Sequence, residues 1–304
     1  MVMKCFSCNN PAVIYRKYEG RAWCKKHFSK QLEAKVKLTI RNNKLVERGD
    51  KICVALSGGK DSSLTLYLMN KFFGKRPDIE VFAITINEGI RGYRDKSIKV
   101  AKELCKELGI RHYIFSFKEE FGKSMDEIIK EKKARACTYC GVLRRFILNK
   151  KSRELGATKL ATGHNLDDEI QSIFINNLKG DIGRLIRLGP KPPFTRKEFV
   201  TRIKPLREIP EKETALYCLL NGIKFHNSRC PNSKDSIRYD VRKFINEMEE
   251  KYPGTKYNII RNFDTMLPAL RSYFADTGKV KLCPKCGEPT SREVCKACEL
   301  LESL

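Results

Sequence analysis

The chain has 304 residues, of which 61 are Lys or Arg and 36 are Asp or Glu, so its formal net charge is +25. That length suffices for one large core domain with small appendages, and so strong a positive charge favours a polyanionic partner, above all a nucleic acid. Neither a membrane-spanning apolar run of ~18 residues nor a signal-peptide stretch is present, so we expect a cytoplasmic protein with no membrane contact.

The first thirty residues carry a metal-ligand pattern. Cys5 and Cys8 form one ligand pair, and Cys24 and His27 form a second. Pairs two residues apart suit a tetrahedral structural zinc ion, and cysteines in a cytoplasmic chain indicate metal sites rather than disulfides. We therefore predict an N-terminal zinc finger over residues 1–30, followed by a basic helix at 29–46. Whether the finger grips RNA, contacts a partner or ties down the chain end stays open.

A phosphate-binding loop is predicted next, between an apolar strand at 52–56 and an amphipathic helix at 63–72. It reads Ser57-Gly58-Gly59-Lys60-Asp61-Ser62. Glycines let the backbone approach a phosphate, and the free N–H groups at the helix start point at it. The loop is not a Walker A motif, which would require glycine in place of Val54. The structural alternative is an ordinary Gly-Gly turn with a helix cap.

Strands and helices alternate over the following residues. We predict further strands at 81–87, 112–117 and 159–162, and helices at 97–108, 141–155, 167–177, 211–221, 237–251 and 257–267. This alternation predicts an α/β fold, with a parallel sheet covered by helices on both faces. Ligands of such sheets bind at the carboxyl ends of the strands. Residues 178–210 are expected to form an irregular basic loop.

A second site motif begins where the strand at 159–162 ends. It reads Gly163-His164-Asn165-Leu166-Asp167-Asp168. The paired carboxylates open a helix near the expected phosphates, where they would hold Mg²⁺ or take a proton from the attacking group. The alternative is structural, with Asn165 or Asp167 as a helix cap and His164 as a satisfied imidazole.

Three internal cysteines border glycine, proline and arginine rather than apolar residues. Cys137 and Cys140 form a CxxC motif, and Cys230 precedes a proline. The CxxC alone fits a redox pair, half a zinc site or cluster ligands, but a Cys-Pro ending is typical of iron–sulfur ligation. Three thiolates suit a cluster that keeps one iron open.

The C-terminus repeats the zinc pattern, with four thiolates from Cys283, Cys286, Cys295 and Cys298. Their spacing predicts a zinc ribbon. The chain is thus divided into an N-terminal zinc finger (1–30), a catalytic domain (31–220), a helical continuation with the third cluster cysteine (221–275) and a C-terminal zinc ribbon (276–304).

Together these motifs resemble the tRNA 2-thiouridine synthetases, which are ATP pyrophosphatases with zinc modules at both ends. The likeness covers nearly the whole chain and is strongest for the archaeal and thermophile enzymes that act on uridine 54. It implies an adenine nucleotide alpha-hydrolase-like fold, a homodimer, tRNA as substrate and a ubiquitin-like thiocarboxylate protein as sulfur carrier. The implied cofactors are ATP, Mg²⁺, two Zn²⁺ and one [4Fe-4S] cluster.

The resemblance also implies roles for individual residues. ATP would be bound by Ser57, Gly58, Gly59, Lys60, Asp61, Ser62, Thr85, Gly163 and Asp167. The cluster would be held by Cys137, Cys140 and Cys230. Asp168 would be the catalytic carboxylate, and Arg144 would hold the substrate where a lysine is common in the family. A guanidinium and an ammonium differ in reach, so this position departs from the family pattern.

The implied reaction has two steps. Uracil O2 attacks the α-phosphate of ATP while Asp168 removes the N3 proton, and sulfur presented by the cluster then displaces AMP at C2. A persulfide exchanged between Cys140 and Cys230 is the competing route. Wobble uridine 34 is the alternative acceptor. An ammonia-using ligase and a zinc-finger RNA-binding protein without catalysis are the rival functions.

Overall fold

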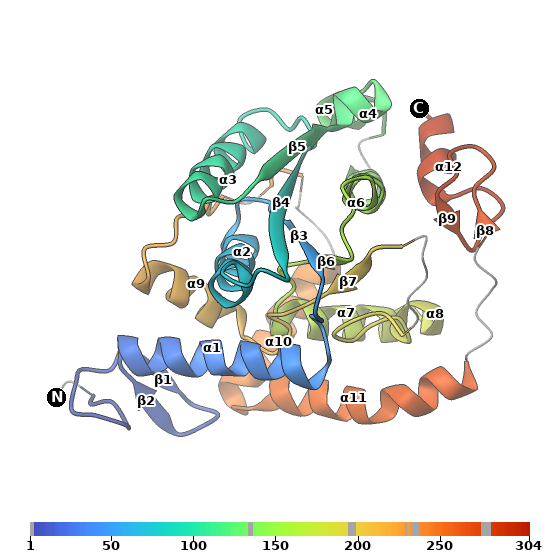
Figure 1. The fold of residues 1–304 in the computed structure, drawn as a ribbon. Helices are drawn as coiled ribbons and strands as arrows, with labels where there is room; N and C mark the ends of the chain where they lie inside the picture. Colours follow the sequence, from blue (N-terminus) through green and yellow to red (C-terminus); the bar gives the residue numbers. More distant parts are fainter. Residues whose placement is uncertain (1–2, 133–135, 194–198, 229, 233–236, 275–280) are drawn as a thin grey trace.

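The computed structural model describes residues 3–132, 136–193, 199–228, 230–232, 237–274 and 281–304 (Figure 1). Its centre is a parallel five-stranded sheet. In spatial order the strands are β5 (His112–Ser116), β4 (Glu80–Asn87), β3 (Lys51–Ala55), β6 (Lys159–Ala161) and β7 (Thr201–Ile203). The predicted parallel sheet is therefore confirmed. No helix of the described residues is long and apolar enough to cross a bilayer.

Helices cover both faces of the sheet, and the strand periodicity explains how. Ile52 and Val54 of β3 point into one apolar cluster, whereas Cys53 between them points into the other. A strand buried on both faces needs a continuous apolar run, and β3 has one from Ile52 to Ala55, after the exposed Lys51. The first cluster is covered by α1 (Lys25–Asn42), α2 (Lys60–Phe73), α3 (Arg94–Leu108) and α9 (Glu211–Leu220).

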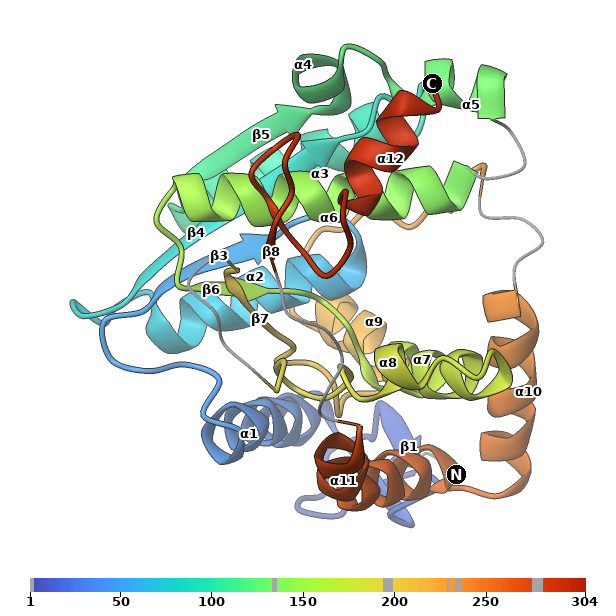
Figure 2. The same cartoon turned by 90° about the vertical axis from the view of Figure 1, so that its right-hand side faces the viewer.

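The second face carries α4 (Phe117–Phe121), α5 (Met125–Lys132) and α6 (Ala136–Glu154). Beyond the edge at β7 lies a layer of four helices (Figure 2). These are α7 (Leu166–Leu178), α8 (Ile182–Leu185), α10 (Ile237–Lys251) and α11 (Thr255–Tyr273). Buried side chains of α7, α10 and α11 form a separate apolar cluster there.

Small modules occupy the two ends of the chain, far apart in Figure 1. The N-terminal module holds the hairpin of β1 (Ile14–Arg16) and β2 (Arg21–Trp23), beside α1. The C-terminal module consists of β8 (Lys281–Leu282), β9 (Pro289–Thr290) and α12 (Lys296–Glu302), and α12 contacts α6. The predicted boundary at 275–276 lies outside the described residues.

Some predicted elements were wrong in their extent. The segment 178–210 is not wholly irregular, since it contains α8 and the edge strand β7. Three residues are too few for an alternating pattern to be recognised. The helix expected at 141–155 begins at Ala136, so Cys137 and Cys140 lie within its first turns. The short helices α4 and α5 were not predicted.

Candidate active site

The phosphate loop lies between β3 and α2, at the carboxyl end of the central strand. Gly58 has a φ of +81°, and a Cβ there would stand 2.2 Å from the carbonyl oxygen of Ser97 in α3. Only glycine fits this position. The Ser62 hydroxyl donates to the Gly59 carbonyl at 3.0 Å and accepts from the Ser57 N–H at 3.1 Å, which closes the loop on itself.

Two side chains of the loop are bound to neighbouring helices. Lys60 Nζ donates to Asp61 Oδ2 at 2.8 Å and to Glu211 Oε1 of α9 at 2.9 Å. Asp61 Oδ1 accepts from Asn165 Nδ2 at 3.1 Å and from Thr214 Oγ1 at 2.6 Å. Burial alone would lower the pKa of Lys60, but these carboxylates raise it, so the ammonium stays charged beside the loop.

The turn between β6 and α7 packs directly against the loop. A Cβ on Gly163 would lie 2.7 Å from the backbone carbon of Asp61. Asn165 then caps α7 in a capping box with Asp168. The structure therefore brings the two predicted motifs, 57–62 and 163–168, into contact.

The adjacent carboxylates of that turn point in different directions. Asp168 keeps 35% of its side chain exposed, and burial followed by repulsion from Asp61 raises its pKa to about 6. Asp167 is buried, accepts from the Glu211 N–H at 2.7 Å and pairs with Lys256 of α11. Asp168 thus faces the site, whereas Asp167 is engaged in the core and is not brought to the open side of the loop.

Thr85, which was predicted to bind ATP, is fully buried in β4. Its hydroxyl donates to the Leu56 carbonyl at 2.7 Å and lies 2.7 Å from His112 Nε2. Burial, and then Lys102, lowers the pKa of His112 to about 4, so the imidazole is neutral. Thr85 therefore supports the strand end under the loop rather than offering a free group to a ligand.

The three internal cysteines are brought together beside Arg144. Cys140 has Cys137 and Cys230 among its electrostatic neighbours, and burial raises its pKa to about 11. Cys137 is exposed and donates to the Asn232 carbonyl at 3.3 Å. These thiols do not belong to the ligand groups that lie within 4.8 Å of one another in the described chain. Three thiols beside one guanidinium are a donor set of the kind that iron–sulfur clusters use, and cluster ligation by them stays a prediction.

An ion-pair network, buried at Arg94 and Glu88 and exposed at Arg144, connects the phosphate loop with these cysteines. Arg94 Nη1 donates to the Ser57 carbonyl at 3.0 Å, and Arg94 Nε lies 2.6 Å from Glu88 Oε2. The other oxygen of Glu88 lies 3.4 Å from Arg144 Nη1, one helical turn beyond Cys140. Glu88 and Arg94 were missed in the sequence, although they follow the carboxyl end of β4, where ligand-binding side chains are expected.

Both predicted zinc sets are assembled. Cys5, Cys8, Cys24 and His27 bring their ligand atoms within 4.8 Å of one another, as do Cys283, Cys286, Cys295 and Cys298. Cys8 and Cys24 Sγ are 3.7 Å apart, and Cys286 and Cys295 Sγ are 3.6 Å apart. Tetrahedral ligands about 2.3 Å from one zinc ion have this mutual spacing.

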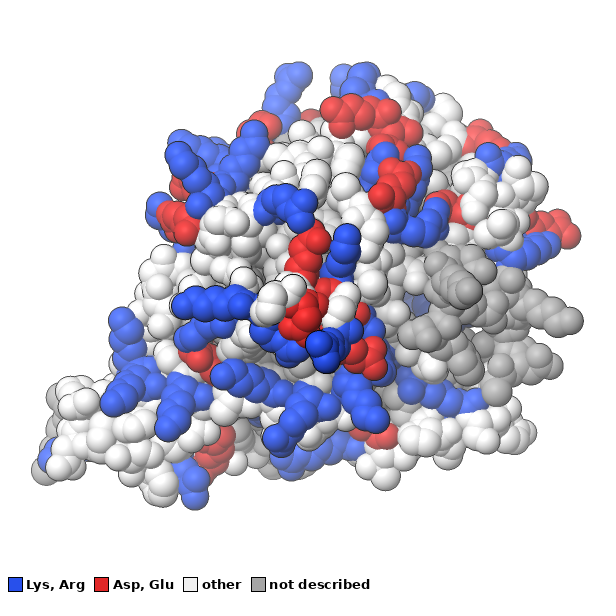
Figure 3. All heavy atoms as spheres, viewed as in Figure 1, with Lys and Arg blue, Asp and Glu red and all other residues white. Residues whose placement is uncertain are grey.

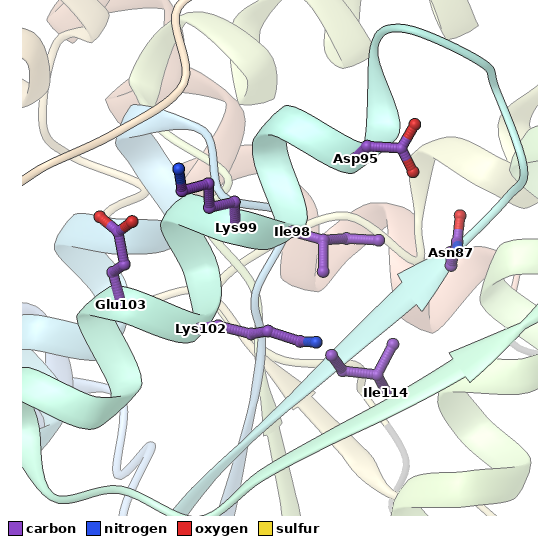
Figure 4. A pocket seen from close by; sticks show the side chains of 7 residues that line it. All are labelled: Asn87, Asp95, Ile98, Lys99, Lys102, Glu103 and Ile114. Carbon is purple, nitrogen blue, oxygen red and sulfur yellow. The ribbon is translucent and has the colours of Figure 1, made fainter.

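A cavity of about 510 Å³ lies between α3 and the sheet edge (Figure 4). It is lined by Asn87, Asp95, Ile98, Lys99, Lys102, Glu103 and Ile114. No residue of the phosphate loop or of the cysteine set lines it. The cavity is therefore separate from the candidate site.

Comparison with known proteins gives consistent results. A family model described as a PP-loop domain matches residues 28–249, and one described as the N-terminal LIM domain of 2-thiouridine synthetase TtuA matches residues 4–29. The chain is 36% identical to tRNA 2-thiolation protein NcsA of Haloferax volcanii over 99% of both chains. It is 35% identical to tRNA-5-methyluridine(54) 2-sulfurtransferase of Pyrococcus horikoshii over 98% of this chain and 93% of that one.

One solved structure is similar over the whole length. The U34-tRNA thiolase NcsA from Methanococcus maripaludis, solved with its [4Fe-4S] cluster, superposes with a TM-score of 0.85 at 36% identity. The match covers 100% of this chain and 97% of that chain. With the phosphate loop, the cysteine set and the terminal ligand groups all assembled, this chain belongs to the tRNA 2-thiolation family of PP-loop proteins.

Proposed function

We propose that this protein is an ATP-dependent sulfurtransferase that converts a uridine of tRNA to 2-thiouridine. The observation that carries the proposal is the network from the Ser57 carbonyl through Arg94 and Glu88 to Arg144 beside Cys140. It joins an adenylating loop to a sulfur-handling cysteine set. Thiolation first activates a carbonyl oxygen of the base and then replaces that oxygen with sulfur. The reaction therefore needs the loop and the cysteine set beside the same base.

In the first step the loop would hold the triphosphate while uracil O2 attacks the α-phosphate. Asp168, with a pKa of about 6, is ionised at neutral pH and would accept the N3 proton. The described carboxylates form no metal-ligand group near the loop, and Asp61 and Asp167 are already paired. We therefore propose that Mg²⁺ arrives as the counter-ion of ATP, bound by phosphates and water.

For the second step we propose that Cys137, Cys140 and Cys230 hold a [4Fe-4S] cluster. When bound, the cluster supplies a Lewis-acidic iron for the incoming sulfur. Arg144 would orient the adenylated base from its position between Glu88 and Cys140. Sulfur displaces AMP at C2, and AMP leaves with the carbonyl oxygen.

A group of cations supports tRNA as the substrate. The pKa of His164 lies well below its usual range, because the imidazole is buried and because Lys204 and Arg202 repel its charged form. Burial and repulsion from Arg202 and Arg144 lower the pKa of Arg145 to about 10. Within the described part of the chain, neither Arg145 nor Arg202 has a carboxylate in ion-pair contact. Excess positive charge of this kind favours phosphate oxygens.

The finer assignments are also proposals. We propose uridine 54 as the acceptor, because the model that matches residues 4–29 is that of TtuA. Uridine 34 is the second candidate, since the solved structure of similar fold is a U34-tRNA thiolase. We further propose a ubiquitin-like thiocarboxylate protein as sulfur carrier, a homodimer, Zn²⁺ in both terminal ligand sets, and the four-part division at residues 30, 220 and 275.

The proposal is tested by mapping thiolated nucleosides in tRNA from a deletion strain. Mass spectrometry should show loss of 2-thiouridine at one position, restored by the wild-type gene and not by Cys140→Ser. Loss at position 54 supports our assignment, and loss at position 34 replaces it. Unchanged 2-thiouridine at both positions would refute the function and leave the ligase or the RNA-binding module.

A further inference from the structure

A buried ion pair joins the N-terminal module to the core, beside the apolar packing of Trp23. Arg16, at the end of β1, donates from Nε and Nη2 to the carboxylate of Glu213 in α9, at 2.9 and 2.6 Å. Both side chains are 5% exposed. The Tyr18 hydroxyl donates to the same carboxylate at 2.8 Å. Bidentate, charge-assisted contacts of this kind fix geometry strongly.

Glu213 lies in the turn of α9 that holds the phosphate loop. Two positions before it, Glu211 accepts from Lys60, and one position after it, Thr214 donates to Asp61. The contact with the module and the two contacts with the loop therefore originate within one helical turn. A shift of that turn on loss of the Arg16 contact would move both loop side chains.

The C-terminal module makes an equivalent contact on the other half of the site. Tyr139 stands between Cys137 and Cys140, is 2% exposed, and its hydroxyl lies 2.7 Å from Ser303 Oγ after α12. Farther along α6, Asn149 donates to Glu288 at 3.1 Å, and Arg153 pairs with the same carboxylate. Figures 1 and 2 both show α12 beside α6.

Apolar packing reinforces this second contact. Cys283, Cys295 and Leu300 of the module share one buried cluster with Leu143 and Ile147 of α6. The helix that carries the CxxC motif is therefore supported along its length by the module, and its first turn is held at Tyr139.

We infer that the two terminal modules position separate halves of the reaction site. The N-terminal module positions the phosphate loop through Arg16, Glu213 and Thr214, and the C-terminal module positions Cys137 and Cys140 through Tyr139 and Ser303. This inference rests on the proposed nucleotide and cluster sites.

The test uses the full-length protein with two binding readouts. Arg16→Met, Arg16→Lys and Tyr18→Phe change the N-terminal contact, whereas Tyr139→Phe and Ser303→Ala change the C-terminal one. Tyr15→Phe, at a 49% exposed site of β1, is the matched control. ATP dissociation constants are measured by equilibrium dialysis. Cluster retention is measured as iron content and visible absorbance during a chelator challenge, with zinc content and thermal unfolding followed in parallel.

We expect each group of variants to change one readout and to leave the other at its wild-type value. Arg16→Met should weaken ATP binding about tenfold, with Arg16→Lys and Tyr18→Phe intermediate and cluster retention unchanged. Tyr139→Phe and Ser303→Ala should accelerate iron loss several-fold while ATP affinity stays at the wild-type value. If Arg16→Met does not fold, Tyr18→Phe and Arg16→Lys provide the measurement.

Two results would overturn the inference: both variant groups changing both readouts equally, or N-terminal variants that leave ATP affinity at the wild-type value. Neither readout requires tRNA or thiolation. A wild-type protein that binds ATP and iron but forms no 2-thiouridine would therefore refute the proposed function and leave this inference standing.

Discussion

Asp167 and Asp168 are adjacent in sequence but differ in their surroundings. Successive helical residues point about 100° apart, so in the first turn of α7 one carboxylate enters the core and the other faces the site. Asp167 is neutralised by Lys256, whereas Asp168 meets the like charge of Asp61. The difference gives Asp168 a pKa suited to a base at neutral pH.

We predict that activity depends on the ionised form of Asp168. Its pKa is raised to about 6, so kcat/KM should fall as the pH decreases through that value. Asp168→Asn should lower kcat by about 10²–10⁴ and remove this limb of the profile. The pKa of Asp168 in the folded state is above the ordinary value for Asp. The protonated carboxyl therefore stabilises the folded protein at low pH, and this stabilisation is lost as the pH rises through about 6. The variant should therefore unfold no earlier than wild type at pH 7, and an unchanged limb would contradict the assignment.

Gly163 gives a second residue-level prediction. A Cβ there would meet the backbone of Asp61 at 2.7 Å, so Gly163→Ala must displace the phosphate loop. We expect a loss of roughly 1–3 kcal/mol in unfolding free energy together with loss of ATP binding. Gly183→Ala in α8, where the nearest atom is 3.8 Å away, is the control and should retain both. Wild-type ATP affinity in Gly163→Ala would show that the two motifs are not in contact.

At the scale of elements, ion pairs join the helices of the helical layer to one another and to the segment that follows β7. Lys256 of α11 reaches Asp167 of α7, and Arg207 reaches Asp264 of α11 at 2.8 Å. Lys204 donates to Glu169 of α7 at 2.6 Å. Because Lys256 and Asp167 are both buried, removal of one leaves the charge of the other without compensation.

Lys256→Met should therefore destabilise the protein by about 3–5 kcal/mol. Adding Asp167→Asn should recover part of that loss, because it removes the unpaired charge. Lys243→Met, at a side chain that is 69% exposed, should change the unfolding free energy by less than about 0.5 kcal/mol. Chemical denaturation measures all three, and equal effects of the two lysine variants would refute the role of the buried pair.

The sheet and both terminal sets of metal-ligand residues were predictable because their signals are local. β3 is an apolar run ended by glycines, and paired cysteines two residues apart specify a metal site without knowledge of the fold. The strand β7 was not predictable, since its three residues include the polar Thr201 and Arg202. Its place in the sheet depends on pairing with β6, forty residues earlier, in the register Leu160↔Arg202.

The motifs of the candidate site were predictable from the sequence, but the side-chain contacts that join these motifs were not. Glu88 and Arg94 bridge the loop and the cysteine helix only because β4 and α3 bring them there. The engagement of Asp167 depends on Lys256, whose contact spans 89 positions of the chain. Sequence patterns of short period contain no information about such contacts.

At the scale of the whole molecule, positive charge is spread widely over the surface. Lys and Arg outnumber acidic side chains on the face in Figure 3 and follow the length of α1. A tRNA bound to such a surface would release counter-ions in proportion to the phosphates contacted. Two cations next to the site, Arg145 and Arg202, should contribute to tRNA binding and to this release of counter-ions.

We predict that Arg145→Gln and Arg202→Gln each weaken tRNA binding and reduce the slope of log Kd against log salt by about 1. Lys99→Gln, on the separate cavity beside α3, should leave both unchanged. Fluorescence anisotropy over a salt series measures these values. Slopes identical to wild type in both arginine variants would exclude Arg145 and Arg202 from the tRNA contact.

The most direct test of the account is a complete reaction under anaerobic conditions. The protein, loaded with iron, sulfide and zinc, is incubated with ATP, Mg²⁺, sulfide and unmodified tRNA, and 2-thiouridine and AMP are quantified together. We predict equal amounts of the two products, neither of them formed without tRNA, and both formed about 10²–10⁴ times more slowly by Asp168→Asn. AMP formed without tRNA, or no 2-thiouridine from a fully metal-loaded protein, would contradict the account.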